Sequence, residues 1–118
     1  KLSLLHGRAA AVRLHRDFGI SDEDLLEAVA NHTFGGENLC NLAKIVFVAD
    51  KIEPGRPQSS DEYRANLFSM PLTAMTLSVV QENIDYLHNK GKAVADVSLR
   101  FCEELKKAAE ETGMKGEA

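Results

Sequence analysis

Residues 39–56 read LCNLAKIVFVADKIEPGR, and the structure that this stretch adopts decides the fold class. Its apolar run at residues 44–49, KIVFVA, has the length of a buried β-strand. Over the longer stretch, however, the apolar residues fall on one side of a helix: Leu39, Leu42, Ile45, Val46 and Ala49. The prolines and glycine at residues 54–57 then end the segment. We therefore predict a helix here, with Asn38 as its cap.

The segments before this helix have the same period. Residues 4–18 carry apolar positions at helical spacing, and Gly19 supplies the left-handed residue that commonly ends a helix. Ser21, followed by an acidic first turn, predicts the start of a second helix. That helix should stop near His32, because two consecutive glycines follow closely.

The segments after it are helical in pattern as well. Ser59 or Ser60 starts a short helix, and Pro71 lies in the first turn of a long helix that Gly91 closes. A last amphipathic helix covers about residues 96–111, and residues 112–118 should form a frayed tail. No segment alternates at period two for long enough to predict a strand. We predict one all-α domain of five to six helices over residues 1–118.

The composition excludes several function classes. The 118 residues are 44% hydrophobic and 27% charged, as in an ordinary globular domain. A net charge of -4 argues against a protein that binds nucleic acid by neutralising phosphates. No apolar run reaches the length of a bilayer span, so no membrane partner is expected. Cys40 and Cys102 are too few for a disulfide framework, which favours reduced thiols and a cytoplasmic location.

The first residues suggest a larger parent protein. Lys1 is not a methionine, and Leu2, Leu4 and Leu5 follow it without a cap or a turn. We therefore expect the chain to begin partway through a longer polypeptide. A fused nicotinate-nucleotide adenylyltransferase domain stays open, as does a homodimer.

Two polar residues stand out as candidates for chemistry. His32 ends a helix just before a glycine turn, so its imidazole could point into a cleft. Asp50 ends the most apolar helix, where a carboxylate is costly to bury unless it is paired or bound to a metal. From spacing alone, His32 is more simply a helix cap, and Asp50 a salt-bridge partner of Lys51 or Arg56.

Three short motifs favour a role in chemistry for His32 and Asp50 over the simpler structural roles. LLHG at residues 4–7, NHT at residues 31–33 and ADKIEPGR at residues 49–56 occur in that order. They resemble LLHG, YHTTG and ADYIEPGR of the YqeK family of HD-domain phosphohydrolases, at closely similar separations. The likeness extends over most of residues 2–92.

The resemblance implies that residues 1–118 are the C-terminal part of a single all-α HD-domain bundle, incomplete at the N-terminus, with two divalent metal ions, iron or alternatively manganese. It implies that His6, His32 and Asp50 are metal ligands. It also implies that a water bridging the metals is the nucleophile, with no separate protein nucleophile. Arg56 and Lys51 would bind the phosphates of a nucleotide substrate, and Thr33 would orient His32 or contact substrate. The implied reaction is cleavage of diadenosine tetraphosphate into two molecules of ADP.

The sequence also departs from the family pattern. The leading His and the His-Asp pair of the superfamily are missing, so we expect them upstream of Lys1 and predict that this chain alone is inactive. Gly36 stands where the family often has Arg, and Lys51 replaces the usual Tyr. Two alternatives stay open: an HD phosphohydrolase for another nucleotide, and a non-catalytic helical module that regulates or binds a partner.

Overall fold

The computed structural model of the chain describes residues 2–53 and 55–117, and the side chains of residues 7–53 and 55–111. Within these residues it contains six α-helices and no strand, which confirms the predicted all-α class. The helices are α1 (Leu2–Phe18), α2 (Glu23–Asn31), α3 (Asn41–Lys51), α4 (Asp61–Phe68), α5 (Leu72–Asn89) and α6 (Asp96–Glu117). The stretch at residues 44–49 is helical, as its flanks predicted. None of the described helices combines the length and apolar character that a bilayer span requires.

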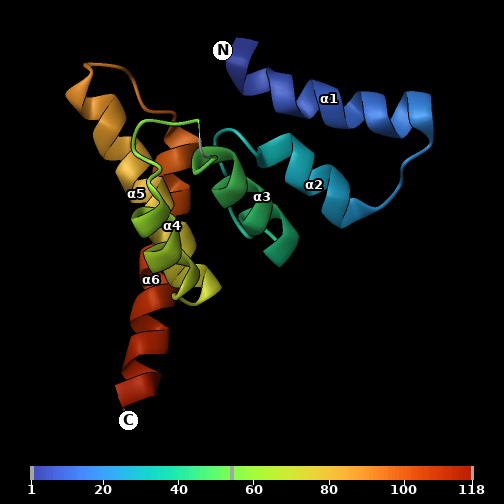
Figure 1. The fold of residues 1–118 in the computed structure, drawn as a ribbon. Helices are drawn as coiled ribbons and strands as arrows, with labels where there is room; N and C mark the ends of the chain where they lie inside the picture. The colour runs from blue at the N-terminus through green and yellow to red at the C-terminus, as the bar shows by residue number, and fades with distance from the viewer. Residues whose placement is uncertain (1, 54, 118) are drawn as a thin grey trace.

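The helices pack as a series of neighbours rather than around one axis. α1 lies against α2, α2 against α3, α3 against α5 and α5 against α6, whereas α4 touches α5 only lightly (Figure 1). The radius of gyration is 15.0 Å, compared with about 13.5 Å for a compact domain of this length. The excess arises because α1 and the end of α6 extend away from the centre (Figure 1).

The core lies where α3, α5 and α6 meet. Phe47 of α3 and Phe101 of α6 pack edge to face, with ring centroids 5.2 Å apart and planes at 88°. Both rings are almost completely buried, together with Leu67, Val80 and Leu105. Burial of these side chains fixes the end of α3, which carries the candidate site residues.

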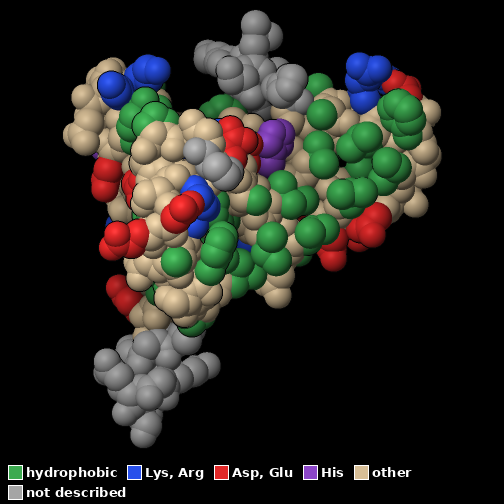
Figure 2. Space-filling model, viewed as in Figure 1, with side chains coloured by type: hydrophobic (Ala, Val, Ile, Leu, Met, Phe, Trp, Pro, Cys, Tyr) green, Lys and Arg blue, Asp and Glu red, His purple; other side chains and the backbone are tan. Residues whose placement is uncertain are grey.

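The arm formed by α1 and α2 leaves apolar side chains exposed. Val12 and Phe18 of α1 are 56% and 69% exposed, and Leu42 and Ile45 of α3 also reach solvent. Figure 2 shows hydrophobic side chains gathered over this half of the molecule. Patches of this kind are typical of surfaces that another protein segment covers.

The helix ends follow the sequence except at the starts of α2, α3 and α5 and at the end of α6. Pro71, predicted in the first turn of α5, is instead its N-cap. Gly19 and Gly91 both have φ of +69°, as predicted for helix-ending glycines. The N-cap of α2 is Asp22, not Ser21, because the Asp22 carboxylate accepts from the Leu25 N–H at 3.0 Å. Ser60 caps α4 as one of the two predicted serines. α6 continues to Glu117, beyond the predicted end near residue 111. The side chains of residues 112–118 lie outside the described residues, so the frayed tail stays a prediction.

The predicted Asn38 cap of α3 is wrong. Cys40 is the N-cap, and its N–H donates to the Glu27 carboxylate of α2 at 2.7 Å. Asn38 instead adopts a left-handed conformation with φ of 55°, and its N–H donates to Glu104 of α6. Carboxylates from two other helices therefore hold the start of α3, and local sequence does not reveal such partners.

We predict that Gly35→Ala destabilises the protein more than Gly91→Ala. Both glycines have positive φ, so each substitution costs about 1–2 kcal/mol in backbone conformation. A Cβ at Gly35 would also collide with the buried Phe101 ring, whereas a Cβ at Gly91 meets open space. The collision should add about 1–3 kcal/mol. Urea unfolding measures both losses, and equal losses would contradict the packing described for Gly35.

Candidate metal and phosphate site

The candidate site lies where the C-terminal ends of α2 and α3 meet, and Lys51 joins them. The Lys51 ammonium donates to Asp50 Oδ2 at 2.9 Å and to the His32 backbone carbonyl at 3.4 Å. His32 is the C-cap of α2, whereas Asp50 and Lys51 form the last turn of α3. Two of the residues predicted as metal ligands, His32 and Asp50, are therefore connected through one cation.

The His32 ring caps the end of α2 through Nδ1 and leaves Nε2 available as a metal ligand. Its Nδ1 lies 2.7 Å from the Val29 carbonyl, which can only accept a hydrogen bond. Nδ1 therefore carries the proton, and in the neutral ring Nε2 keeps its lone pair. Metal-binding histidines are commonly oriented in this way by a backbone carbonyl. The simpler role of His32 as a helix cap and its role as a ligand are thus compatible.

The Asp50 carboxylate is half-buried beside two cations. Oδ2 accepts from Lys51 and lies 3.8 Å from the Arg56 guanidinium, so both predicted salt-bridge partners are present. Because both contacts involve Oδ2, Oδ1 is the oxygen available to a ligand. The Asp50 carboxylate therefore places a negative charge at the edge of the core.

Lys51 is an unusual residue for a helix end because its side chain is only 9% exposed. Its ammonium lies 4.9 Å from the centroid of the Phe47 ring. Burial lowers the pKa of Lys51, and the hydrogen bond and charge of Asp50 oppose this shift. An ammonium held in this way needs an anionic partner to remain charged.

Arg56 is positioned by the loop between α3 and α4. Gln58 and Ser59 donate from their side chains to the Lys51 and Ile52 carbonyls and hold this loop against the end of α3. Within the described structure, the buried Nε of Arg56 has no hydrogen-bond partner; Glu53 lies 3.9 Å away, beyond bonding distance. Nε itself is inaccessible, so an anion such as phosphate would meet the terminal nitrogens of the guanidinium, whose side chain is 37% exposed.

The remaining predicted residues are placed less directly. Thr33 lies half-buried in the turn after α2, and in the described part of the chain no contact links its hydroxyl to Asp50 or Arg56. The side chain of His6 lies outside the described residues, so its convergence with His32 stays a prediction. His15 and His88 are exposed, as predicted for solvated helix positions.

Gly7 shows how closely α1 approaches α2. A Cβ at Gly7 would lie 2.7 Å from the Ala30 carbonyl oxygen and 2.9 Å from that of Val29. No real side chain tolerates this contact, so only glycine permits the packing. The Val29 carbonyl is also the acceptor of the His32 ring. The backbone of α1, one residue after position 6, therefore passes beside the group that orients His32.

A complete metal cluster is not formed by the described side chains. Among residues 7–53 and 55–111, no group of three or more His, Cys, Asp or Glu side chains is arranged to hold a metal ion. His32 and Asp50 supply two donors of suitable type. The cysteines are unsuited to this role, because both are free and burial raises the pKa of each thiol.

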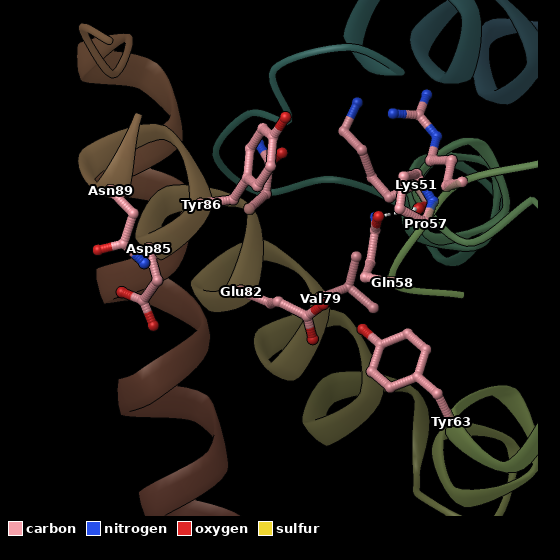
Figure 3. Close-up of a pocket in the computed structure, with 11 residues that line it drawn as sticks. Lys51, Pro57, Gln58, Tyr63, Val79, Glu82, Asp85, Tyr86 and Asn89 are labelled. Carbon is pink, nitrogen blue, oxygen red and sulfur yellow. Dashed lines mark hydrogen bonds between the residues drawn. The ribbon is translucent and has the colours of Figure 1, made fainter. Parts of the chain in front are cut away.

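A cavity of about 340 Å³ adjoins this site, between the α3–α4 loop, α4 and α5 (Figure 3). Lys51 and Arg56 line it on the side of Asp50. Gln58 lies on the same side, where it donates to the Lys51 carbonyl, and Tyr63 comes from α4. The opposite wall is formed by residues of α5: Val79, Glu82, Asn83, Asp85, Tyr86 and Asn89. Burial, followed by the hydrogen bond and charge of Glu82, raises the pKa of Tyr63.

The α5 wall of this cavity was not predicted from the sequence, which indicated only a long helix between Pro71 and Gly91. Val79, Glu82, Asn83 and Tyr86 are spaced as one helix face, so the signal was present. Only the position of Tyr63 on a separate helix could not be found in this way.

Known proteins resemble this chain in sequence and in fold. The chain is 34% identical over 91 residues to a symmetrical bis(5′-nucleosyl)-tetraphosphatase of Halalkalibacterium halodurans, covering 77% of the chain and 49% of that protein. A protein of the same name from Bacillus subtilis is 30% identical over 91 residues, with the same coverage. The chain thus spans about half the length of the curated relatives it matches. No family model matches it.

A solved structure shares the fold. It is that of a predicted HD superfamily hydrolase involved in NAD metabolism from Clostridium acetobutylicum, with a TM-score of 0.78 and 30% identity over 88% of this chain and 55% of that one. The fold of the chain is therefore that of an HD superfamily hydrolase. Within this class, the chain is homologous to the symmetrical bis(5′-nucleosyl)-tetraphosphatases, which confirms the predicted resemblance to the YqeK branch.

We predict that neutral His32 is the Nδ1–H tautomer. The Val29 carbonyl at 2.7 Å accepts only from a protonated Nδ1. Nitrogen-15 NMR of the imidazole rings, recorded at a pH where they are neutral, measures the tautomer. The exposed His88 serves as control, since it should show the mixture of a solvated ring. If the neutral His32 ring carried its proton mainly on Nε2, that nitrogen would have no lone pair for a metal, and the assignment of His32 as a ligand through Nε2 would be contradicted.

Proposed function

We propose that this chain forms the metal- and phosphate-binding part of a hydrolase that cleaves diadenosine tetraphosphate symmetrically into two molecules of ADP. One observation carries the proposal. The Lys51 ammonium donates both to the backbone carbonyl of His32 and to the Asp50 carboxylate, beside Arg56, at the edge of a cavity. The names of the two homologous tetraphosphatases support the choice of substrate.

The donors fit a divalent metal such as iron or manganese. Imidazole nitrogen and carboxylate oxygen suit both ions, and His32 Nε2 and Asp50 Oδ1 are the atoms that would hold them. His6 is proposed as a further ligand, supported by the close packing of α1 on α2 at Gly7. Two bound ions would supply an activated water and neutralise charge on the phosphate under attack.

The two cations of the site are suited to the polyphosphate. The Arg56 side chain is 37% exposed, and a planar guanidinium can contact two phosphate oxygens. Lys51 adds a positive charge in surroundings where screening by water is weak. We propose that both hold phosphate, and that Thr33 contacts substrate or orients His32.

The predictions about partners, oligomeric state and location belong to this proposal. The partner is a nucleotide rather than nucleic acid or a membrane. A homodimer and a cytoplasmic location stay predictions.

Two alternatives have support in particular observations. The solved relative is described as involved in NAD metabolism, which favours comparison with other nucleotide substrates. The described side chains hold two metal donors rather than a complete shell, which agrees with a non-catalytic binding module. A panel of nucleotides tested on the complete protein separates these alternatives from the main proposal.

We predict that the complete protein hydrolyses diadenosine tetraphosphate in the presence of Fe²⁺ or Mn²⁺. Asp50→Asn should lower kcat/KM by about 100-fold or more, because it removes a metal ligand. Asp17→Asn is the matched control, since Asp17 also lies beside two arginines but on exposed α1. Chromatography of ADP measures the rate.

The 118-residue chain alone should produce no ADP above background, because its metal shell is incomplete. Full activity of Asp50→Asn in the complete protein would contradict the metal site. Turnover by the chain alone would show that the described residues suffice.

A further inference from the structure

We propose that the 340 Å³ cavity beside the metal and phosphate site binds the nucleoside end of the substrate, with a base that carries an exocyclic amine stacked on Tyr86 and its amine donating to Glu82. This inference rests on the proposed function, since it assigns a nucleotide to the same site. It adds the residues that recognise the base.

The charges on the two walls of the cavity determine how a bound nucleotide is oriented. Lys51 and Arg56 lie on the wall next to Asp50, and Glu82 and Asp85 lie on the opposite wall. Phosphate is attracted to the first wall and repelled by the second. A nucleotide therefore places its phosphates toward Asp50 and its uncharged base toward α5.

Tyr86 offers a stacking surface for that base. It is a large aromatic residue with 53% of its surface exposed, although it lines a cavity. The Lys90 ammonium lies over its ring at 5.8 Å from the centroid, and Lys90 is not among the cavity-lining residues. The other face of the ring is thus available to a flat ligand. Figure 3 shows Tyr86 and Lys51 on opposite sides of the gap, with their polar tips pointing the same way.

Glu82 provides an acceptor that selects the base. Its carboxylate is half-buried and lies on the side of the Tyr63 hydroxyl (Figure 3), whose pKa is raised by burial and by the nearby Glu82 charge. A carboxylate has two oxygens, so a donor from a ligand can bind. Adenine presents an amine donor at its 6-position, where hypoxanthine presents a carbonyl oxygen. A carbonyl oxygen that faces the half-buried carboxylate leaves both acceptors without a donor, so hypoxanthine should bind more weakly than adenine.

The test measures binding of ADP to the 118-residue chain by calorimetry, in the absence of metal. Tyr86→Ala should weaken ADP binding by at least about 5-fold, because it removes base stacking. Tyr86→Phe is the control and should bind within about 2-fold of the original chain, because it keeps the ring. Pyrophosphate should bind equally to all three proteins, because its contacts lie on the opposite wall. Circular dichroism checks that the variants fold.

A second comparison tests the role of Glu82. Inosine diphosphate should bind at least about 5-fold more weakly than ADP, and Glu82→Gln should abolish this preference because an amide can donate to a carbonyl. Undetectable ADP binding at millimolar concentration, an unaffected Tyr86→Ala or equal binding of the two nucleotides would each overturn the inference. None of these measurements depends on hydrolysis. Binding without turnover by the complete protein would therefore refute the proposed function alone.

Discussion

The buried ammonium of Lys51 is the interaction on which the organisation of the site depends. It connects the carbonyl that ends α2 with the carboxylate that ends α3, and it rests against the Phe47 ring of the core. Burying such a charge is costly unless hydrogen bonds and an anion compensate for it. Asp50, at the end of α3, supplies that anion at 2.9 Å from the ammonium. The core and the site are joined through one side chain.

Glycine permits the close contacts that complete this arrangement. At Gly7, α1 approaches the last turn of α2 so closely that a Cβ would meet the Val29 and Ala30 carbonyls. At Gly35, the turn after α2 lies against the Phe101 ring with φ of +79°. The first contact places α1 beside the acceptor of His32. The second ties the end of α2 to α6, so the orientation of His32 depends on both sides of the molecule.

The fold was predictable because it is encoded locally. The period of apolar residues along α3 outweighed the strand-like run at residues 44–49, and glycines marked two helix ends. The N-cap of α3 was not predictable, because Glu27 reaches it from another helix. Likewise, spacing alone did not bring His32 and Asp50 together; the family motifs did. The cavity was not predicted, because Tyr63 of α4 and Tyr86 of α5 come to line one cavity only through tertiary packing.

The central claim is that His32 and Asp50 belong to one metal site. Titration of the 118-residue chain with Mn²⁺, followed by paramagnetic broadening of its amide signals, tests this directly even where binding is weak. The account predicts that His32, Asp50 and Lys51 lose intensity first. The exposed acidic pair Asp61 and Glu62 at the start of α4 serves as reference and should respond only at higher concentration. Earlier or equal broadening at that pair would contradict the claim.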